Sequence, residues 1–150
     1  MKLTSPAFIS YNHIPSRYTC DGEDFSPPLV IEDIPEKTRS LALIADDPDA
    51  PNGTWVHWLA WNMDPRLSGI PENSVPNGTV EGITSFGKPG WGGPCPPSGV
   101  HRYFFKLYAL DTELNLGEET TAVDLKNAMN GHILDTAELV GLYSRKEQTS

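Results

Sequence analysis

The sequence contains no apolar run long enough to cross a bilayer, and its N-terminus, MKLTSPAFISYN, lacks the uninterrupted apolar segment of a signal peptide. Basic side chains are also scarce, since 11 Lys and Arg stand against 20 Asp and Glu and give a formal net charge of −9. This balance disfavours non-specific nucleic-acid binding and docking on an anionic membrane, because both need clustered cations. We therefore expect a cytoplasmic protein that neither binds nucleic acid nor inserts into a membrane.

Cysteine is nearly absent, with only Cys20 and Cys95 in 150 residues. Two cysteines do not make the disulfide scaffold of a small secreted domain, so we expect reduced thiols, with a bridge between them as the alternative. A chain of 150 residues is long enough for one domain with its own hydrophobic core, and we predict a single domain over residues 1–150.

Several familiar catalytic motifs are missing. The sequence has no Gly-x-x-x-x-Gly-Lys phosphate loop, no Gly-rich dinucleotide fingerprint, no Cys-x-x-Cys pair and no Gly-x-Ser-x-Gly nucleophile elbow. Its Asp and His residues could hold a divalent metal, which makes a metal-assisted hydrolase the best enzymatic alternative. None of them shows the compact spacing of a metal site, so we expect no metal, no cofactor and no enzymatic activity.

Fourteen prolines and thirteen glycines divide the chain into short segments of β character. Apolar or aromatic runs predict strands at 29–31, 40–45, 55–63, 79–83 and 103–110. The proline-rich stretch 64–78 is predicted to be a connecting loop. The fold class is therefore mainly β.

One helix is expected late in the chain. Thr121 can cap it, and Asn130-Gly131 would end it. Residues 132–143 then predict a last strand, with a second helical turn at 135–138 as the alternative.

A first polar cluster follows the apolar run 40–45. Asp47 and Asp49 flank Pro48, and His57 lies in the next predicted strand, where alternation would place it on the same face as Leu59. A lone His on an apolar face is often a hydrogen-bonded core residue. This pattern alone leaves the role of His57 open.

A second cluster joins a Gly- and Pro-rich loop, residues 86–99, to the aromatic strand after it. In a strand that continues back to the loop, His101 and Tyr103 share one face and Arg102 takes the other. Arg102 is expected to pair with an acid such as Asp49, with ligand contact as the alternative.

The two clusters together could form an anion site. Asp47 and Asp49 could accept hydrogen bonds from both imidazoles, which fixes the tautomer of each ring. Backbone N–H groups from Gly90 to Gly93 could complete the site for a phosphate or carboxylate. The alternative is that both histidines are structural.

The stretches 47–51 (DPDAP), 57–58 (HW) and 93–103 (GPCPPSGVHRY) resemble the two signature regions of the phosphatidylethanolamine-binding proteins. This family includes the Raf kinase inhibitor proteins and the plant flowering-time regulators. With YTCDG at 18–22 and SPPL at 26–29, the sequence is most similar to the short bacterial and archaeal branch. The similarity runs from Leu3 to about Arg145.

The resemblance implies a β-sandwich of two antiparallel sheets, with one or two short helices near the C-terminus and a small anion pocket at one end. In the family, that pocket takes phosphate, acetate or a phosphorylated head group such as that of a phospholipid. Carried over by motif, the ligand-binding residues would be Asp47, Asp49, Pro51, His57, Gly93, Pro94, His101 and Tyr103.

The family is not generally catalytic. The resemblance implies a non-enzymatic binding protein and a regulator of the Raf kinase inhibitor type, with a kinase or protease as protein target and a homodimer as a compatible state. The alternatives are inhibition through a surface independent of the pocket, and the metal-assisted hydrolase. If the segments that carry Cys20 and Cys95 meet, a reversible disulfide could also reshape the pocket.

Overall fold

A computed structural model describes residues 1–145 of the chain. In chain order its elements are β1 (Lys2–Thr4), the 3₁₀ helix η1 (Ser16–Tyr18), β2 (Leu29–Glu32), β3 (Ser40–Asp47), β4 (Trp55–Met63), β5 (Gly69–Ile70), β6 (Val80–Glu81), β7 (His101–Leu110), α1 (Ala122–Met129) and β8 (Ile133–Tyr143). Strands therefore dominate the described part of the chain, as the sequence predicted.

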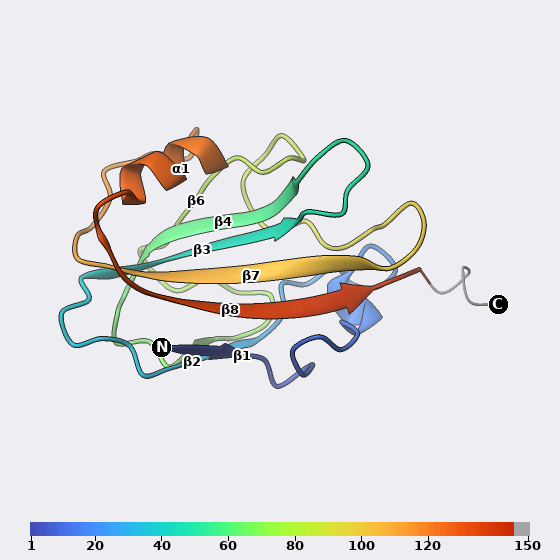
Figure 1. The fold of residues 1–150 in the computed structure, drawn as a ribbon, viewed down its shortest axis with the longest axis horizontal. Helices are drawn as coiled ribbons and strands as arrows, with labels where there is room; N and C mark the ends of the chain where they lie inside the picture. The colour runs from blue at the N-terminus through green and yellow to red at the C-terminus, as the bar shows by residue number, and fades with distance from the viewer. Residues whose placement is uncertain (146–150) are drawn as a thin grey trace.

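The strands form two antiparallel sheets. The larger has the order β6-β4-β3-β7-β8, and the smaller has the order β1-β2-β5. In Figure 1 the small sheet lies below the large one, and α1 lies on the opposite side of it. The β-sandwich expected from the resemblance is confirmed, with one α-helix near the C-terminus.

Two apolar layers hold these parts together. Between the sheets, Leu43 and Phe105 of the large sheet pack in one cluster with Leu29 and Ile31 of the small sheet. On the other face of the large sheet, Leu125 of α1 packs with a second cluster of buried side chains. Burying each such side chain contributes about 1.5–3 kcal/mol to the stability of the fold. The strand β3 lies between β4 and β7 and is buried along its whole length.

Two strands extend further than their apolar runs predicted. β3 continues to Asp47, and β7 begins at His101 rather than at Tyr103. Polar residues occupy these extensions because the backbone ladder continues beyond the apolar core. The extensions place Asp47 and His101 at the same end of two neighbouring strands.

The helix and the last strand are confirmed. Thr121 caps α1 in a capping box with Asp124, and β8 is one strand, so the helical-turn alternative for residues 135–138 is wrong. The sequence did not reveal β1 and β5, and β5 interrupts the predicted loop 64–78. Strands of two or three residues are too short to show a period, and only pairing with β2 defines them.

The prediction of reduced thiols is wrong. Cys20 and Cys95 form a disulfide, with their Cα atoms 5.5 Å apart. The chain that follows η1 meets the Gly- and Pro-rich loop here, and the N–H of Cys20 donates to the carbonyl of Pro94 at 3.1 Å. This tertiary contact, which leaves no trace in local sequence, brings the two sulfur atoms together.

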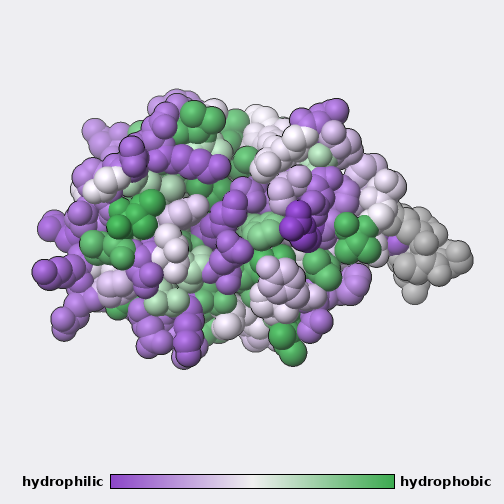
Figure 2. Space-filling view, viewed as in Figure 1, coloured by the Kyte–Doolittle hydropathy of each residue, from purple (hydrophilic) through white to green (hydrophobic). Residues whose placement is uncertain are grey.

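Figure 2 shows one face of the molecule, where hydrophilic side chains are mixed with small separate hydrophobic groups. Within residues 1–145, no helix is long and apolar enough to cross a membrane.

Candidate functional site

The candidate site lies at one end of the large sheet, where β3 ends and β4 and β7 begin. In the antiparallel register, Asp47 at the end of β3 pairs with Trp55 at the start of β4, and Asp46 pairs with Phe104 near the start of β7. The Gly- and Pro-rich loop closes over this end and leaves a cavity of about 240 Å³. Its lining residues are Asp47, Ala50, Pro51, Trp55, His57, Phe86, Gly93, Cys95, Pro96, Pro97, His101 and Tyr103.

The cavity brings together most of the residues predicted from sequence. The six that line it are Asp47, Pro51, His57, Gly93, His101 and Tyr103. Asp49 and Pro94 belong to the same loops but are not among the lining residues.

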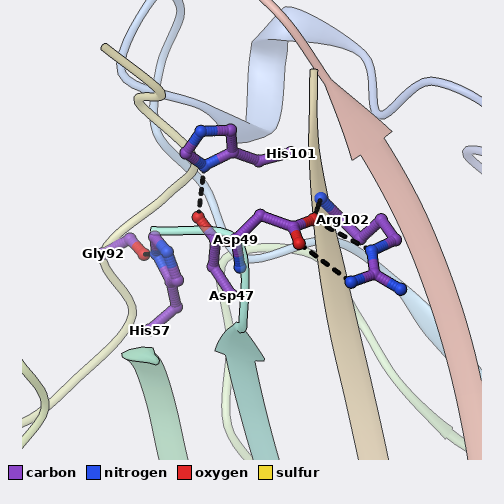
Figure 3. A network of polar contacts seen from close by, with 6 residues as sticks. All are labelled: Asp47, Asp49, His57, Gly92, His101 and Arg102. Carbon is purple, nitrogen blue, oxygen red and sulfur yellow. Dashed lines mark hydrogen bonds and ion pairs between the residues drawn. The ribbon is translucent and has the colours of Figure 1, made fainter. Parts of the chain in front are cut away.

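A carboxylate orients the imidazole of His101. Nδ1 of His101 lies 2.7 Å from Oδ2 of Asp47, and both side chains are buried. Oδ1 of the same carboxylate accepts the backbone N–H of Asp49 at 2.8 Å. Because Nδ1 donates to the carboxylate, Nε2 is the remaining nitrogen of the ring, and it has no hydrogen-bond partner among the described residues (Figure 3).

A backbone carbonyl orients the imidazole of His57. Nδ1 of His57 lies 2.6 Å from the carbonyl oxygen of Gly92, and the N–H of Gly92 donates back to the carbonyl of His57 at 3.1 Å. The ring packs edge-on against Tyr103 with centroids 5.2 Å apart. Burial lowers the pKa of His57, so the ring favours its neutral form.

The predicted facing of His57 is wrong, and a β-bulge is the reason. Ala45 pairs with Trp58 and Asp46 pairs with Val56, so His57 is an extra residue on β4. Leu59 packs on the side of the sheet that α1 covers, whereas His57 contacts Tyr103 at the opposite side. The bulge turns the imidazole toward the cavity.

Tyr103 supplies the most informative polar atom. Tyr103 is 2% exposed, and its hydroxyl has no hydrogen-bond partner within residues 1–145. Burial and the nearby Asp47 carboxylate raise the pKa of Tyr103 far above its ordinary value, so the phenol keeps its proton. An unpaired buried hydroxyl costs about 1–3 kcal/mol, and a ligand atom that accepted its hydrogen bond would remove that cost.

Asp49 pairs with Arg102 and not with an imidazole. The guanidinium donates to both carboxylate oxygens at 2.8 and 2.9 Å, and the backbone N–H of Arg102 also donates, at 2.9 Å (Figure 3). These bonds lower the pKa of Asp49 to about 2. The predicted ion pair is confirmed. The prediction that Asp49 accepts a hydrogen bond from an imidazole is wrong, because both of its oxygens accept from Arg102, on the other face of β7 from His101.

Two N–H groups of the expected cradle are used within the protein. The N–H of Gly92 donates to the backbone carbonyl of His57, and the N–H of Gly93 donates to the Asp24 carboxylate, whose pKa burial nevertheless raises. Gly93 must be glycine because a Cβ atom there would lie 2.7 Å from the Tyr18 carbonyl oxygen. These N–H groups therefore hold the loop in place and do not point freely into the cavity.

Sequence reasoning missed part of the cavity wall. Trp55 and Phe86 are 39% and 42% exposed and pack edge to face, 5.4 Å apart, at the cavity. Trp55 precedes His57 by two residues, which was a usable signal, whereas Phe86 lies about thirty residues away and only folding brings it there. Cys95, Pro96 and Pro97 carried a signal in the second signature region.

Within residues 1–145, no group of three or more His, Cys, Asp or Glu side chains is arranged to hold a metal ion.

Comparisons with known proteins agree with this architecture. The sequence profile of the family described as phosphatidylethanolamine-binding protein matches residues 4–144. A UPF0098 protein of Methanothermobacter thermautotrophicus is 51% identical over 150 residues, which cover 97% of this chain and 99% of that protein. A UPF0098 protein of Pyrococcus abyssi is 50% identical over 97% of this chain and 86% of its own length.

Two solved structures share the fold over almost the whole chain. The phosphatidylethanolamine-binding protein homolog CT736 of Chlamydia trachomatis superposes with a TM-score of 0.93 at 42% identity, covering 97% of each chain. E. coli YbcL, described as a member of the mammalian family, superposes with a TM-score of 0.91 at 30% identity, covering 97% of this chain and 98% of its own.

Proposed function

Because this chain belongs to the phosphatidylethanolamine-binding protein family, we propose that it is a non-enzymatic binding protein that holds a small anion in the cavity between β3, β4 and β7. The anion would be a phosphate, a phosphorylated head group or a carboxylate. One observation carries the proposal, namely the buried Tyr103 hydroxyl that has no partner at the cavity.

The ligand would lie between the two imidazoles. His57 and His101 line the cavity with Tyr103, and the Nε2 atom of each ring has no hydrogen-bond partner in the part of the chain that the structure describes. The cavity is small, and its other walls are the apolar side chains and prolines of the two loops. This arrangement suits a compact polar head group that enters from an apolar mouth.

A titration followed by NMR tests the proposal. Phosphoethanolamine and acetate should produce saturable shifts of the His57 and His101 ring resonances. The variant Tyr103→Phe should weaken binding about tenfold to a hundredfold, because a hydrogen bond to a charged group is worth about 1.5–3 kcal/mol. Tyr108→Phe, which alters a half-buried phenol elsewhere on β7, is the matched control.

The absence of any shift at millimolar ligand would make both histidines structural. Unchanged affinity in Tyr103→Phe would remove the hydroxyl from the site.

A second candidate function is inhibition of a protein kinase or protease. The observation that favours it is the exposed aromatic pair Trp55 and Phe86, because aromatic side chains dominate the energetics of protein interfaces. Inhibition assays on a panel of purified kinases and serine proteases would test it. Loss of inhibition in Trp55→Ala but not in Tyr103→Phe would show that the target reads the rim and not the anion.

A cytoplasmic location and a homodimer stay predictions. Cell fractionation and analytical ultracentrifugation would check them.

A further inference from the structure

In their neutral forms, the two imidazoles offer the cavity hydrogen-bond acceptors and no donors. Nδ1 of His57 is bonded to a carbonyl oxygen at 2.6 Å, and Nδ1 of His101 to a carboxylate oxygen at 2.7 Å. Both partners only accept hydrogen bonds, so Nδ1 carries the hydrogen in each ring. Nε2 of a neutral ring is then a bare lone pair. Phosphate and carboxylate oxygens are also acceptors, so neither neutral ring can bind them.

The charged groups around the rings make binding of an anion by the neutral rings still less favourable. Several titratable or charged groups lie around the two rings, in addition to the rings themselves. They are Asp46 and Asp47 of β3, Asp49 after β3, and Arg102, Tyr103 and Lys106 of β7. Asp46 is paired with Lys106 at 3.2 Å, and Asp49 with Arg102 at 2.8 Å. Among the described residues Asp47 has no Lys or Arg partner, and its carboxylate accepts hydrogen bonds from His101 and from the N–H of Asp49.

The lining of the cavity contains no permanent cation. No Lys or Arg belongs to it in the described part of the chain. The N–H groups of Gly92 and Gly93 are engaged within the protein, which leaves two neutral side-chain donors on the cavity wall, the Tyr103 hydroxyl and the Trp55 indole N–H, in the described part of the chain. Two neutral donors beside a carboxylate cannot balance the charge of a bound anion.

Building on the anion pocket proposed above, we propose that the pocket takes up a proton together with each anion. The proton goes to Nε2 of His57 or His101, which converts a bare acceptor into a charged donor that faces the ligand. The site therefore prefers singly charged anions, such as a carboxylate, a phosphodiester or a phosphate monoester that keeps one proton. Burial, which favours the neutral form of His57 in the empty protein, is consistent with this order of events.

Proton counting by isothermal titration calorimetry tests the inference. Binding is measured at pH 8 in buffers of different ionisation enthalpy, with diethyl phosphate and phenyl phosphate as probes. Diethyl phosphate is a permanent monoanion and should bind with uptake of about one proton, so its affinity should fall about tenfold per pH unit as the pH rises above neutral. Phenyl phosphate is doubly charged at pH 8, because its second pKa is about 6, and should take up about one proton more.

Two variants locate the proton. Gln places an amide N–H near the position of Nε2 without titrating, so His57→Gln or His101→Gln should bind diethyl phosphate with less proton uptake than the wild type. His132→Gln is the matched control, because His132 is exposed and pairs with Asp111 away from the cavity. Its proton uptake should equal that of the wild type.

The outcomes separate this inference from the anion pocket itself. Binding with heats that do not depend on the buffer, and with equal affinity at pH 6 and pH 8, overturns proton uptake and leaves the anion pocket standing. Uptake that is unchanged in both His variants also overturns it. No binding of either probe at pH 6 or pH 8 overturns the pocket, and with it the inference.

Discussion

His101 and Asp47 are 54 positions apart in the sequence, and a hydrogen bond of 2.7 Å joins their side chains at one end of the large sheet. The antiparallel register of β3 and β7 creates this contact, because the end of one strand lies beside the start of the other. Since Asp47 is itself held by the N–H of Asp49, the His101 ring cannot turn without breaking a bond. The fold thus holds the His101 ring in one orientation.

The disulfide should contribute strongly to stability. It links residues separated by 75 positions. A crosslink that closes a loop of that length lowers the conformational entropy of the unfolded chain, which raises the free energy of unfolding by about 4 kcal/mol. The double variant Cys20→Ser/Cys95→Ser should lose that free energy of unfolding in urea titrations. Wild type with a dithiol reductant should match it, and the reductant should not affect the variant. Equal stability of the variant and the oxidised wild type would contradict the prediction.

The ion pair between Asp49 and Arg102 should make stability depend on acid. The pKa of Asp49 falls from an ordinary 3.8 to about 2 in the folded state, so its contribution is present above pH 4 and is lost as the pH falls through about 2. Both side chains are substantially exposed, so the contribution is about 1 kcal/mol or less. Asp49→Asn should be less stable than wild type at pH 6, with a difference that shrinks toward pH 2. Asp33→Asn, which changes an exposed carboxylate elsewhere in the chain, is the control.

The lowered pKa of His57 should make stability depend on pH in a higher range than the pKa of Asp49 does. Burial lowers this pKa below the ordinary value of 6.5, so the unfolded state takes up the proton first as the pH falls. Stability should therefore decrease below about pH 6.5, by at most about 1.4 kcal/mol per pH unit. Urea unfolding of His57→Gln between pH 5 and 7 should show a shallower decline, while His132→Gln should follow the wild type. Parallel curves for wild type and His57→Gln would refute this.

Gly93 should not tolerate a side chain. A Cβ atom there would clash with Asp24 Oδ1 and would lie 2.7 Å from the Tyr18 carbonyl oxygen. The Tyr18 backbone cannot move away without disturbing the segment that the disulfide holds at Cys20. Gly93→Ala should therefore lower the free energy of unfolding by about 1–3 kcal/mol. Gly117→Ala is the matched control, because its Cβ would meet only the mobile end of Glu119. Thermal unfolding of the two variants would decide, and equal midpoints would show that the loop adapts.

The sequence by itself determined the composition of the sheets and the residue types of the site. Runs such as SLALIA and WVHWLAWNM are apolar along their length, which is sufficient to predict buried strands. The alternation of His101 and Tyr103 correctly predicted their common face, because β7 is regular at that point. The two signature regions also identified most residues of the cavity wall, since these occur in short ordered stretches.

Only the tertiary structure decided how those residues are connected. A bulge reversed the facing of His57, because one extra residue in a ladder shifts every side chain after it to the other face. The disulfide and the approach of Phe86 depend on contacts between loops, for which local sequence has no period. The same is true of the hydrogen-bond partners of each imidazole. They fix which nitrogen of each ring carries the hydrogen, and the proposed uptake of a proton with each anion rests on that choice.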